Sequence, residues 1–161
     1  MATGESGSSG PKNLGLVKSA PCRCIQSSRS ETRAFYSYCE EFAAETRLDV
    51  DFRLAGLKTM ALDPSMEINL YRLIQEGLIN IRKHAQASRV VVTLTGANPN
   101  IILRIEDDGR GFDVIKRERE LDRERRLSLR SMKERASLLQ GHWRIESQSG
   151  KGTRIFVKIP S

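Results

Sequence analysis

The sequence predicts a two-layer α+β sandwich, in which helices cover one face of a mixed, mostly antiparallel β-sheet. Amphipathic helical segments are interspersed with short strand-like runs along the 161 residues. Two pairs of these runs are joined by short turns, at residues 96–99 and 149–152, and such turns are typical of antiparallel hairpins. Helices and antiparallel strands mixed in this order favour one sheet with its helices on a single face.

Length and composition favour a single folded domain. With 161 residues, 39% of them hydrophobic, the chain can bury one proper core. Residues 1–30 are expected to be a flexible linker or tag with the remnant of a preceding segment, and residues 31–161 the folded domain. No apolar run approaches the roughly 20 residues that span a bilayer. Cys22, Cys24 and Cys39 are too few for a disulfide framework and suit a reducing cytosol.

The net charge of +7 raises the question of a nucleic-acid partner. The densest charged run, residues 116–126, contains six basic and four acidic residues, so its charge is mixed. Because no aromatic residue lies within this run, stacking on bases is unsupported. We therefore expect a solvated, partly helical or mobile segment, with no nucleic-acid contact and no membrane contact.

The first half of the chain is predicted to contain two helices and a strand. Residues 31–47 form the first predicted helix, with Ser30 as its N-cap, and residues 50–54 alternate like a half-buried strand. Asp63 and Pro64 open the strongest predicted helix, because an acidic cap followed by proline is a start signal. The apolar face of this helix, expected to point to the core, comprises Leu70, Ile74, Leu78, Ile81 and Ala85.

The second half is predicted to contain two hairpins with a helix between them. Residues 88–95 and 100–107 read as the strands of the first hairpin. A second amphipathic helix is predicted over residues 128–140, ended by the glycine that follows it. The last hairpin is predicted over residues 143–147 and 153–159.

The helix that begins at Pro64 carries a polar line beside its apolar face. Glu76, Asn80 and His84 recur at every fourth residue, so their side chains stack along one side, with Lys83 close to them. A carboxylate, an amide oxygen and a cation on one face can together serve water, Mg²⁺ and phosphates, because Mg²⁺ takes hard oxygen ligands and keeps several waters. A solvated helix face is the alternative interpretation.

A second polar motif follows the predicted strand 100–107. It reads DDGRGF, from Asp107 to Phe112. The carboxylate of Asp107 can accept a hydrogen bond from the amino group of a base, while Gly109 and Gly111 allow a sharp turn and close approach to a ligand. An ordinary hairpin turn remains the alternative for an Asp-Gly pair.

Four motifs in order give the chain a family resemblance. Residues 70–85 (LYRLIQEGLINIRKHA) resemble the asparagine-containing box of sensor histidine kinases, and residues 107–112 resemble their first glycine box. Residues 127–136 (LSLRSMKERA) resemble the second glycine box with its following helix, and residues 150–153 (GKGT) the closing glycine–threonine turn. Over residues 66–160 the chain resembles the catalytic ATP-binding domain of sensor histidine kinases, a Bergerat fold, closest to the nitrate-sensor-like subfamily.

The resemblance implies a role for each motif residue. Asn80 would hold Mg²⁺ against the ATP triphosphate, and Glu76 would be the catalytic base toward a phosphoacceptor histidine. Lys83 and His84 would lie near the phosphates, and Asp107 would bind the adenine amino group. The other implied nucleotide-binding residues are Gly109, Gly111, Phe112, Arg126, Ser128, Leu129 and Thr153. These roles require that Asn80 and Asp107 face one cavity.

The second glycine box departs from the family pattern, which begins Gly-x-Gly-Leu. Arg126 and Ser128 stand at the two glycine positions. A non-glycine residue forced to positive φ costs on the order of 1–2 kcal/mol, and about 1.4 kcal/mol is a factor of ten in affinity. We therefore predict weakened ATP binding. Pairing of Arg126 with phosphate and a hydrogen bond from Ser128 would offset part of this loss of affinity. The run from Asp113 to Arg126 would be the nucleotide lid.

The phosphoacceptor is expected outside this chain. Neither His84 nor His142, the two histidines of the sequence, lies in a Glu-Leu-His-Asp-like helix. The resemblance therefore implies a protein histidine kinase catalytic domain that works with the dimerisation domain of its parent kinase, and indirectly with a response regulator, in the cytoplasm. This expectation is compatible with a membrane anchor in the parent sensor. Residues 14–17 (LGLV) resemble the segment that leads into this domain.

Two alternatives of other classes stay open. One is a degenerate interaction module on the same fold, with weak or no ATP binding. The other is an anti-sigma-factor-like serine kinase, which shares the fold and would need a protein substrate outside the chain. Loss of Mg·ATP binding on Asn80→Ala substitution would separate the interaction module from the kinases.

Overall fold

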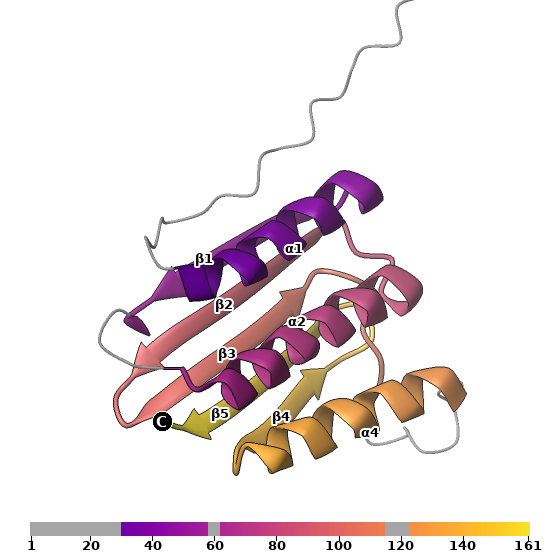
Figure 1. Ribbon diagram of the computed structural model, residues 1–161. Coiled ribbons are helices and arrows are strands. Elements are labelled where there is room, and N and C mark those ends of the chain that lie inside the picture. Colours follow the sequence, from indigo (N-terminus) through magenta and orange to yellow (C-terminus); the bar gives the residue numbers. More distant parts are fainter. Residues whose placement is uncertain (1–29, 58–61, 115–122) are drawn as a thin grey trace, which may run out of the picture.

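The fold is seen in a computed structural model, which describes residues 30–57, 62–114 and 123–161. One five-stranded sheet and three helices form this part of the chain (Figure 1). Apart from Ser30, the predicted N-terminal linker lies outside the described residues. The helices are α1 (Ser30–Thr46), α2 (Pro64–His84) and α4 (Arg123–Leu138). The strands are β1 (Asp49–Ala55), β2 (Arg89–Ala97), β3 (Asn100–Asp107), β4 (His142–Ser147) and β5 (Thr153–Pro160).

The sheet is mixed and mostly antiparallel, as predicted. Its strand order is β1-β2-β3-β5-β4, with β1 parallel to β2 and the other neighbours antiparallel. All three helices lie on one face of the sheet: α1 near β1, α2 near β3 and α4 near the β4 edge (Figure 1). The register of β3 and β5 pairs Asp107 with Thr153, which brings two of the sequence motifs together.

Helix α2 is the central helix, and local sequence explains its start. The Oδ1 atom of Asp63 accepts a hydrogen bond from the backbone N of Met66 at 2.9 Å, and Pro64 occupies the first helical turn. Its predicted apolar face is confirmed, since all five of its residues are buried: Leu70, Ile74, Leu78, Ile81 and Ala85. None of the described helices is both long enough and apolar enough to cross a bilayer.

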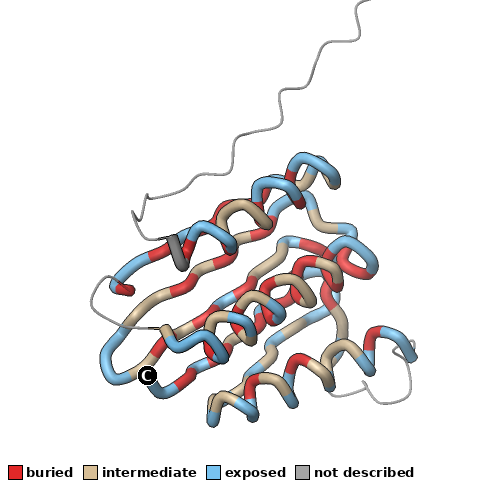
Figure 2. The backbone as a smooth tube through the Cα atoms, viewed as in Figure 1, coloured by how far each residue is buried: buried red, intermediate tan, exposed pale blue. Residues whose placement is uncertain are grey.

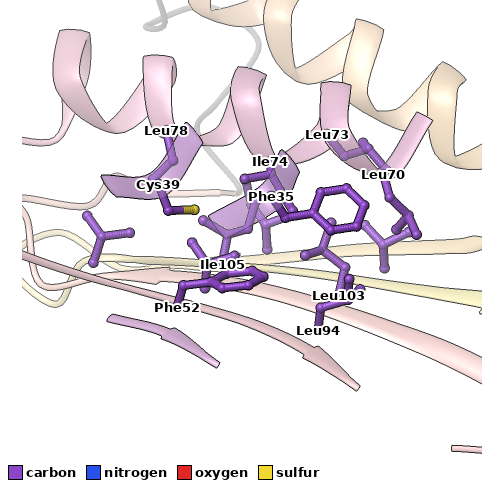
Figure 3. Close-up of a cluster of buried hydrophobic side chains, with 14 of the residues drawn as sticks. Phe35, Cys39, Phe52, Leu70, Leu73, Ile74, Leu78, Leu94, Leu103 and Ile105 are labelled. Atoms are coloured by element: carbon purple, nitrogen blue, oxygen red, sulfur yellow. The ribbon is translucent and has the colours of Figure 1, made fainter. Parts of the chain in front are cut away.

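The core lies between the helices and the sheet. Figure 3 shows Phe35 of α1 and Leu70 of α2 facing side chains of the strands, among them Phe52 of β1. Buried residues follow the sheet side of the helices, while their outer sides are exposed (Figure 2). Burial of such side chains contributes roughly 1.5–3 kcal/mol each, so the inner face of α2 fixes its position on the sheet.

Helix α4 begins earlier than predicted, at Arg123 instead of residue 128. The early turn lies within the mixed-charge run, where no local apolar pattern marks a helix. It is stabilised by distant residues: Glu124 pairs with Lys83 of α2, and Arg125 is buried against Phe112. The C-terminal end of the predicted nucleotide lid is therefore a helical turn, while residues 115–122 lie outside the described part of the chain.

Candidate functional site

A small cavity lies where α2, the adjoining ends of β3 and β5, and the first turns of α4 meet. Its volume is about 20 Å³. Asn80 of α2 and Asp107 of β3 both line it, so the structure confirms that these two residues converge. Thr153 and Arg125 supply the rest of its polar lining, and Phe112 closes one side. Most of the remaining wall is apolar, contributed by α2, the strands and Leu129.

Asp107 is the half-buried acceptor of this cavity. Its Oδ1 atom accepts a hydrogen bond from the backbone N of Gly109 at 2.9 Å. Burial raises the pKa of Asp107, while the backbone N–H groups of Gly109 and Thr153 and the charge of Arg125 act in the opposite direction. A carboxylate in an apolar wall is suited to accept a hydrogen bond from a ligand amino group.

The glycines after Asp107 serve backbone packing. A Cβ atom on Gly109 would lie 2.3 Å from the carbonyl oxygen of Ala85, at the end of α2. Gly111 has a φ of +57°, and a Cβ atom there would lie 2.1 Å from the carbonyl oxygen of Gln148. The two positions let the loop pack against α2 and against the β4–β5 turn. They shape the cavity by holding its wall in place, and neither lines it.

Ser147 is a site residue that sequence reasoning missed. Its Oγ atom accepts a hydrogen bond from the backbone N of Phe112 at 2.9 Å. The same hydroxyl lies 2.9 Å from the carbonyl oxygen of Gly152 and 3.0 Å from Oγ1 of Thr153. It therefore ties the Phe112 loop to β5. A serine at the end of a strand carries no distinctive signal, which is why the sequence did not identify it.

The side-chain amide of Asn80 lines the cavity. Its side chain is buried, and its Nδ2 atom donates to Oγ of Ser128 at 2.8 Å and contacts Sδ of Met132 at 3.6 Å. Both contacts use the amide nitrogen, so Oδ1 remains as the hard oxygen ligand that Mg²⁺ prefers. The residues present thus fit a cation held together with oxygens of a ligand.

Glu76 does not line the cavity. One turn before Asn80, it faces α4, where its Oε1 atom accepts a hydrogen bond from Oγ of Ser131 at 3.1 Å and pairs with Arg135 at 3.4 Å. Its Oε2 atom is buried and has no hydrogen-bond partner among the described residues. The predicted base therefore lies on the α2–α4 interface.

Lys83 and His84 lie at the end of α2, outside the cavity lining. Lys83 forms an ion pair with Glu124 of α4. His84 is buried, and its carbonyl oxygen accepts a hydrogen bond from Nε of Arg110 at 2.8 Å. Both residues thus support the elements that form the site, and any contact with phosphates stays a prediction.

The second glycine box has no backbone strain. Arg126 and Ser128 lie inside α4, and neither is among the non-glycine residues with positive φ in the described chain. The prediction that these positions bear the cost of a left-handed backbone conformation is therefore wrong, because both residues have helical φ, which arginine and serine adopt without strain. Ser128 instead accepts the hydrogen bond from Asn80, and Arg126 is exposed.

Arg125 is the second residue that the sequence did not reveal. Its side chain is buried, with only 7% of the residue exposed, and its guanidinium carbon lies 4.2 Å from the centroid of the Phe112 ring. That geometry is a close cation–π contact. Within the mixed-charge run of the sequence, nothing distinguishes Arg125 from its neighbours.

Comparison with known proteins places the motifs in a family. Residues 65–161 match the family described as histidine kinase-, DNA gyrase B-, and HSP90-like ATPases. The sensor histidine kinase ComP of Bacillus subtilis (strain 168) is 39% identical over 116 residues, 71% of this chain and 15% of ComP. The signal transduction histidine-protein kinase/phosphatase DegS of Brevibacillus brevis is 37% identical over 123 residues, 76% of this chain and 30% of DegS. The chain thus spans less than a third of these relatives.

Solved structures share the fold. The histidine kinase domain of the blue-light activated kinase from Erythrobacter litoralis EL346 matches with a TM-score of 0.60 at 20% identity, covering 79% of this chain and 60% of that one. The Acinetobacter baumannii histidine kinase AdeS matches with a TM-score of 0.59 at 17% identity, covering 81% and 62%. At such identities the likeness shows the fold alone, and it confirms the predicted α+β sandwich.

Proposed function

This chain belongs to the family of histidine kinase-, DNA gyrase B- and HSP90-like ATPases, and we propose that it transfers the γ-phosphate of ATP to a histidine of a separate domain. It is the ATP-binding catalytic domain of a sensor histidine kinase. The observation that carries the proposal is the single cavity shared by Asn80 and Asp107, one suited to a cation and the other to an amino group. An interaction module or a serine kinase is not favoured, because the relatives are histidine kinases.

Binding of ATP divides between the two walls of the cavity. Asp107 accepts a hydrogen bond from the adenine amino group, and Thr153, its neighbour across the β3–β5 pair, supports that edge. Asn80 would hold Mg²⁺ through its side-chain oxygen, and the ion would neutralise charge on the phosphates. Lys83 and Arg126, both near the start of α4, supply positive charge on the phosphate side.

Glu76 takes the proton during transfer. The phosphoacceptor histidine, carried by the dimerisation domain of the parent kinase, attacks the γ-phosphorus, and the bond from this phosphorus to the β–γ bridging oxygen breaks to release ADP. The proton of the histidine ring passes to the carboxylate of Glu76. Ser131 and Arg135 bind one oxygen of this carboxylate and hold the side chain at the α2–α4 interface. A response regulator then receives the phosphoryl group in the cytoplasm.

The first test measures binding. Isothermal titration with a non-hydrolysable ATP analogue and Mg²⁺ should give measurable affinity for the chain, lost on Asn80→Ala substitution. Asn100→Ala, the same change at the far end of β3, is the matched control and should bind as the unchanged chain does. Equal affinity of both variants would overturn the assignment of Asn80, and no measurable affinity of the unchanged chain would favour the interaction module.

The second test measures transfer. The phosphoacceptor domain of the parent kinase is supplied in trans with ATP and Mg²⁺, and phosphorylation should fall at least about 100-fold on Glu76→Gln substitution while nucleotide affinity is retained. A phosphohistidine product is labile in acid and stable in base, whereas phosphoserine behaves in the opposite way. An acid-stable product would exclude histidine transfer.

A further inference from the structure

The strongest unassigned feature of the site is the position of Arg125. It lines the same cavity as Asp107 and Phe112, and its side chain is buried there. The space left in the cavity, about 20 Å³, is room for a single water molecule. A purine ring is several times larger. A purine base therefore does not fit in this cavity while Arg125 forms part of its lining.

A guanidinium group and a purine ring can make similar contacts with a protein. Both are planar, both stack on an aromatic face, and both present N–H groups to a carboxylate. In the structure the Arg125 guanidinium lies over the Phe112 ring at 4.2 Å. Its charge also acts on Asp107, because it lowers the pKa that burial raises. Arg125 thus interacts with the two groups that a bound adenine would use.

The first turn of α4 is mostly exposed. Among residues 123–127 only Arg125 is buried, and Leu127 is 55% exposed despite its apolar side chain. The Lys83–Glu124 ion pair also joins this turn to α2, and both of its side chains are substantially exposed. Exposed ion pairs contribute little to stability. Arg125 is therefore the residue of this turn that is packed into the domain.

We propose that Arg125 is an intramolecular competitor of the nucleotide base: its guanidinium takes the place of adenine between Phe112 and Asp107, and the first turn of α4 must withdraw before the base enters. The inference rests on the proposed function, since it concerns the same cavity. It assigns to Arg125 a role in setting nucleotide affinity, opposite in sign to that of a phosphate-binding arginine. The occupied cavity is a self-inhibited form of the site.

Two ligands distinguish competition with the base from contact with phosphate. Adenosine has the base alone, and ADP has the base with phosphates. Removal of a competitor of the base should tighten the binding of both ligands by the same factor. Removal of a phosphate ligand should instead weaken ADP binding and leave adenosine binding unchanged.

The experiment compares Arg125→Ala with Arg123→Ala by titration with adenosine and with ADP·Mg²⁺. Arg123 is exposed in the same turn, so its variant loses the same charge without opening the cavity. We expect Arg125→Ala to tighten binding of both ligands by roughly threefold to thirtyfold, in line with the range of cation–π strengths from exposed to desolvated contacts. Arg123→Ala should stay within about twofold of the unchanged chain, because its charge is screened by solvent.

The outcomes separate this inference from the proposed function. Unchanged or weaker adenosine binding in Arg125→Ala overturns the inference while nucleotide binding by the unchanged chain still supports the ATPase site. No adenosine or ADP binding by the unchanged chain and by both variants overturns the proposed function itself. Arg125→Gln retains side-chain length without charge, and it should show the same gain if the alanine variant loses helical content by circular dichroism.

Discussion

Two glycines of the β4–β5 turn offer a matched pair of substitutions. Gly150 and Gly152 both have positive φ, at +78° and +74°. A Cβ atom on Gly150 would meet nothing within 4 Å, whereas one on Gly152 would lie 1.9 Å from the carbonyl oxygen of Asp107. The Gly150→Ala variant therefore bears the cost of the left-handed backbone alone. The Gly152→Ala variant bears the same cost and also displaces the end of β3 that carries Asp107.

The magnitudes differ enough to measure. A non-glycine residue in the left-handed region costs about 1–2 kcal/mol, and this is the full expected loss of unfolding free energy for Gly150→Ala. Overpacking adds typically about 1–3 kcal/mol, and the contact at Gly152 is with backbone, which cannot rotate away. We expect Gly152→Ala to lose about 3–5 kcal/mol, a large share of the roughly 5–15 kcal/mol of a whole domain.

Urea unfolding followed by circular dichroism gives the two free energies, and ADP titration gives the effect on the site. Gly150→Ala should bind ADP as the unchanged chain does, because the added Cβ atom meets nothing within 4 Å and leaves Asp107 in place. Gly152→Ala should bind at least about tenfold more weakly, equivalent to about 1.4 kcal/mol, since the Asp107 carboxylate is displaced with its backbone. Equal losses of stability in the two variants, or unchanged ADP affinity in a folded Gly152→Ala, would refute this reasoning.

Two further predictions concern Asp107 and Ser147. Burial raises the pKa of Asp107 above its ordinary 3.8, so the carboxylate is protonated earlier than usual as the pH falls. The ADP affinity of the unchanged chain should therefore decline at a pH above 3.8. The ADP affinity of Asp107→Asn should not show this decline. The same raised pKa favours the protonated form in the folded state, so the contribution of Asp107 to stability is fully present below 3.8 and is lost as pH rises through the folded pKa. At pH 7, Asp107→Asn should therefore unfold at no lower urea concentration than the unchanged chain, and a clear loss would contradict this sign. Ser147→Ala should lower the free energy of unfolding by about 1–3 kcal/mol in the same assay, because the backbone N–H of Phe112 loses its acceptor. Ser137→Ala is the control, since the Ser137 hydroxyl donates to the carbonyl oxygen of Lys133 on the exposed side of α4.

Most elements of the fold could be predicted because their signals are local. The Asp63–Pro64 pair marks the start of α2, and the spacing of its apolar residues defines the face that the structure buries. The strands likewise lie within two residues of their predicted bounds, because apolar alternation and turn residues define both their length and their ends. Convergence of Asn80 and Asp107 was implied by the family resemblance, which assigns both residues to one nucleotide site.

The parts that could not be predicted depend on contacts between distant segments. Ser147 became a site residue only through the loop that β4 and β5 bring to it. Glu76 was expected to face the reaction, yet its pairing with Arg135 directs one oxygen to α4, a contact across 59 residues of sequence. Neither pairing has a local pattern, because the partner residues are ordinary surface types in the sequence.

The departures in the second glycine box connect the early start of α4 with the occupied cavity. Glycine in a helix is less favourable than other residues by up to about 1 kcal/mol. Arg126 and Ser128, which stand at the two glycine positions of the family pattern, therefore favour continuation of α4 toward Arg123. That extra turn is what carries Arg125 into contact with Phe112. The sequence predicted weaker ATP binding from backbone strain at these positions. We infer instead that Arg126 and Ser128 weaken binding by lengthening the helix. Affinity is then limited by the Arg125 side chain in the cavity and not by the conformation of the loop.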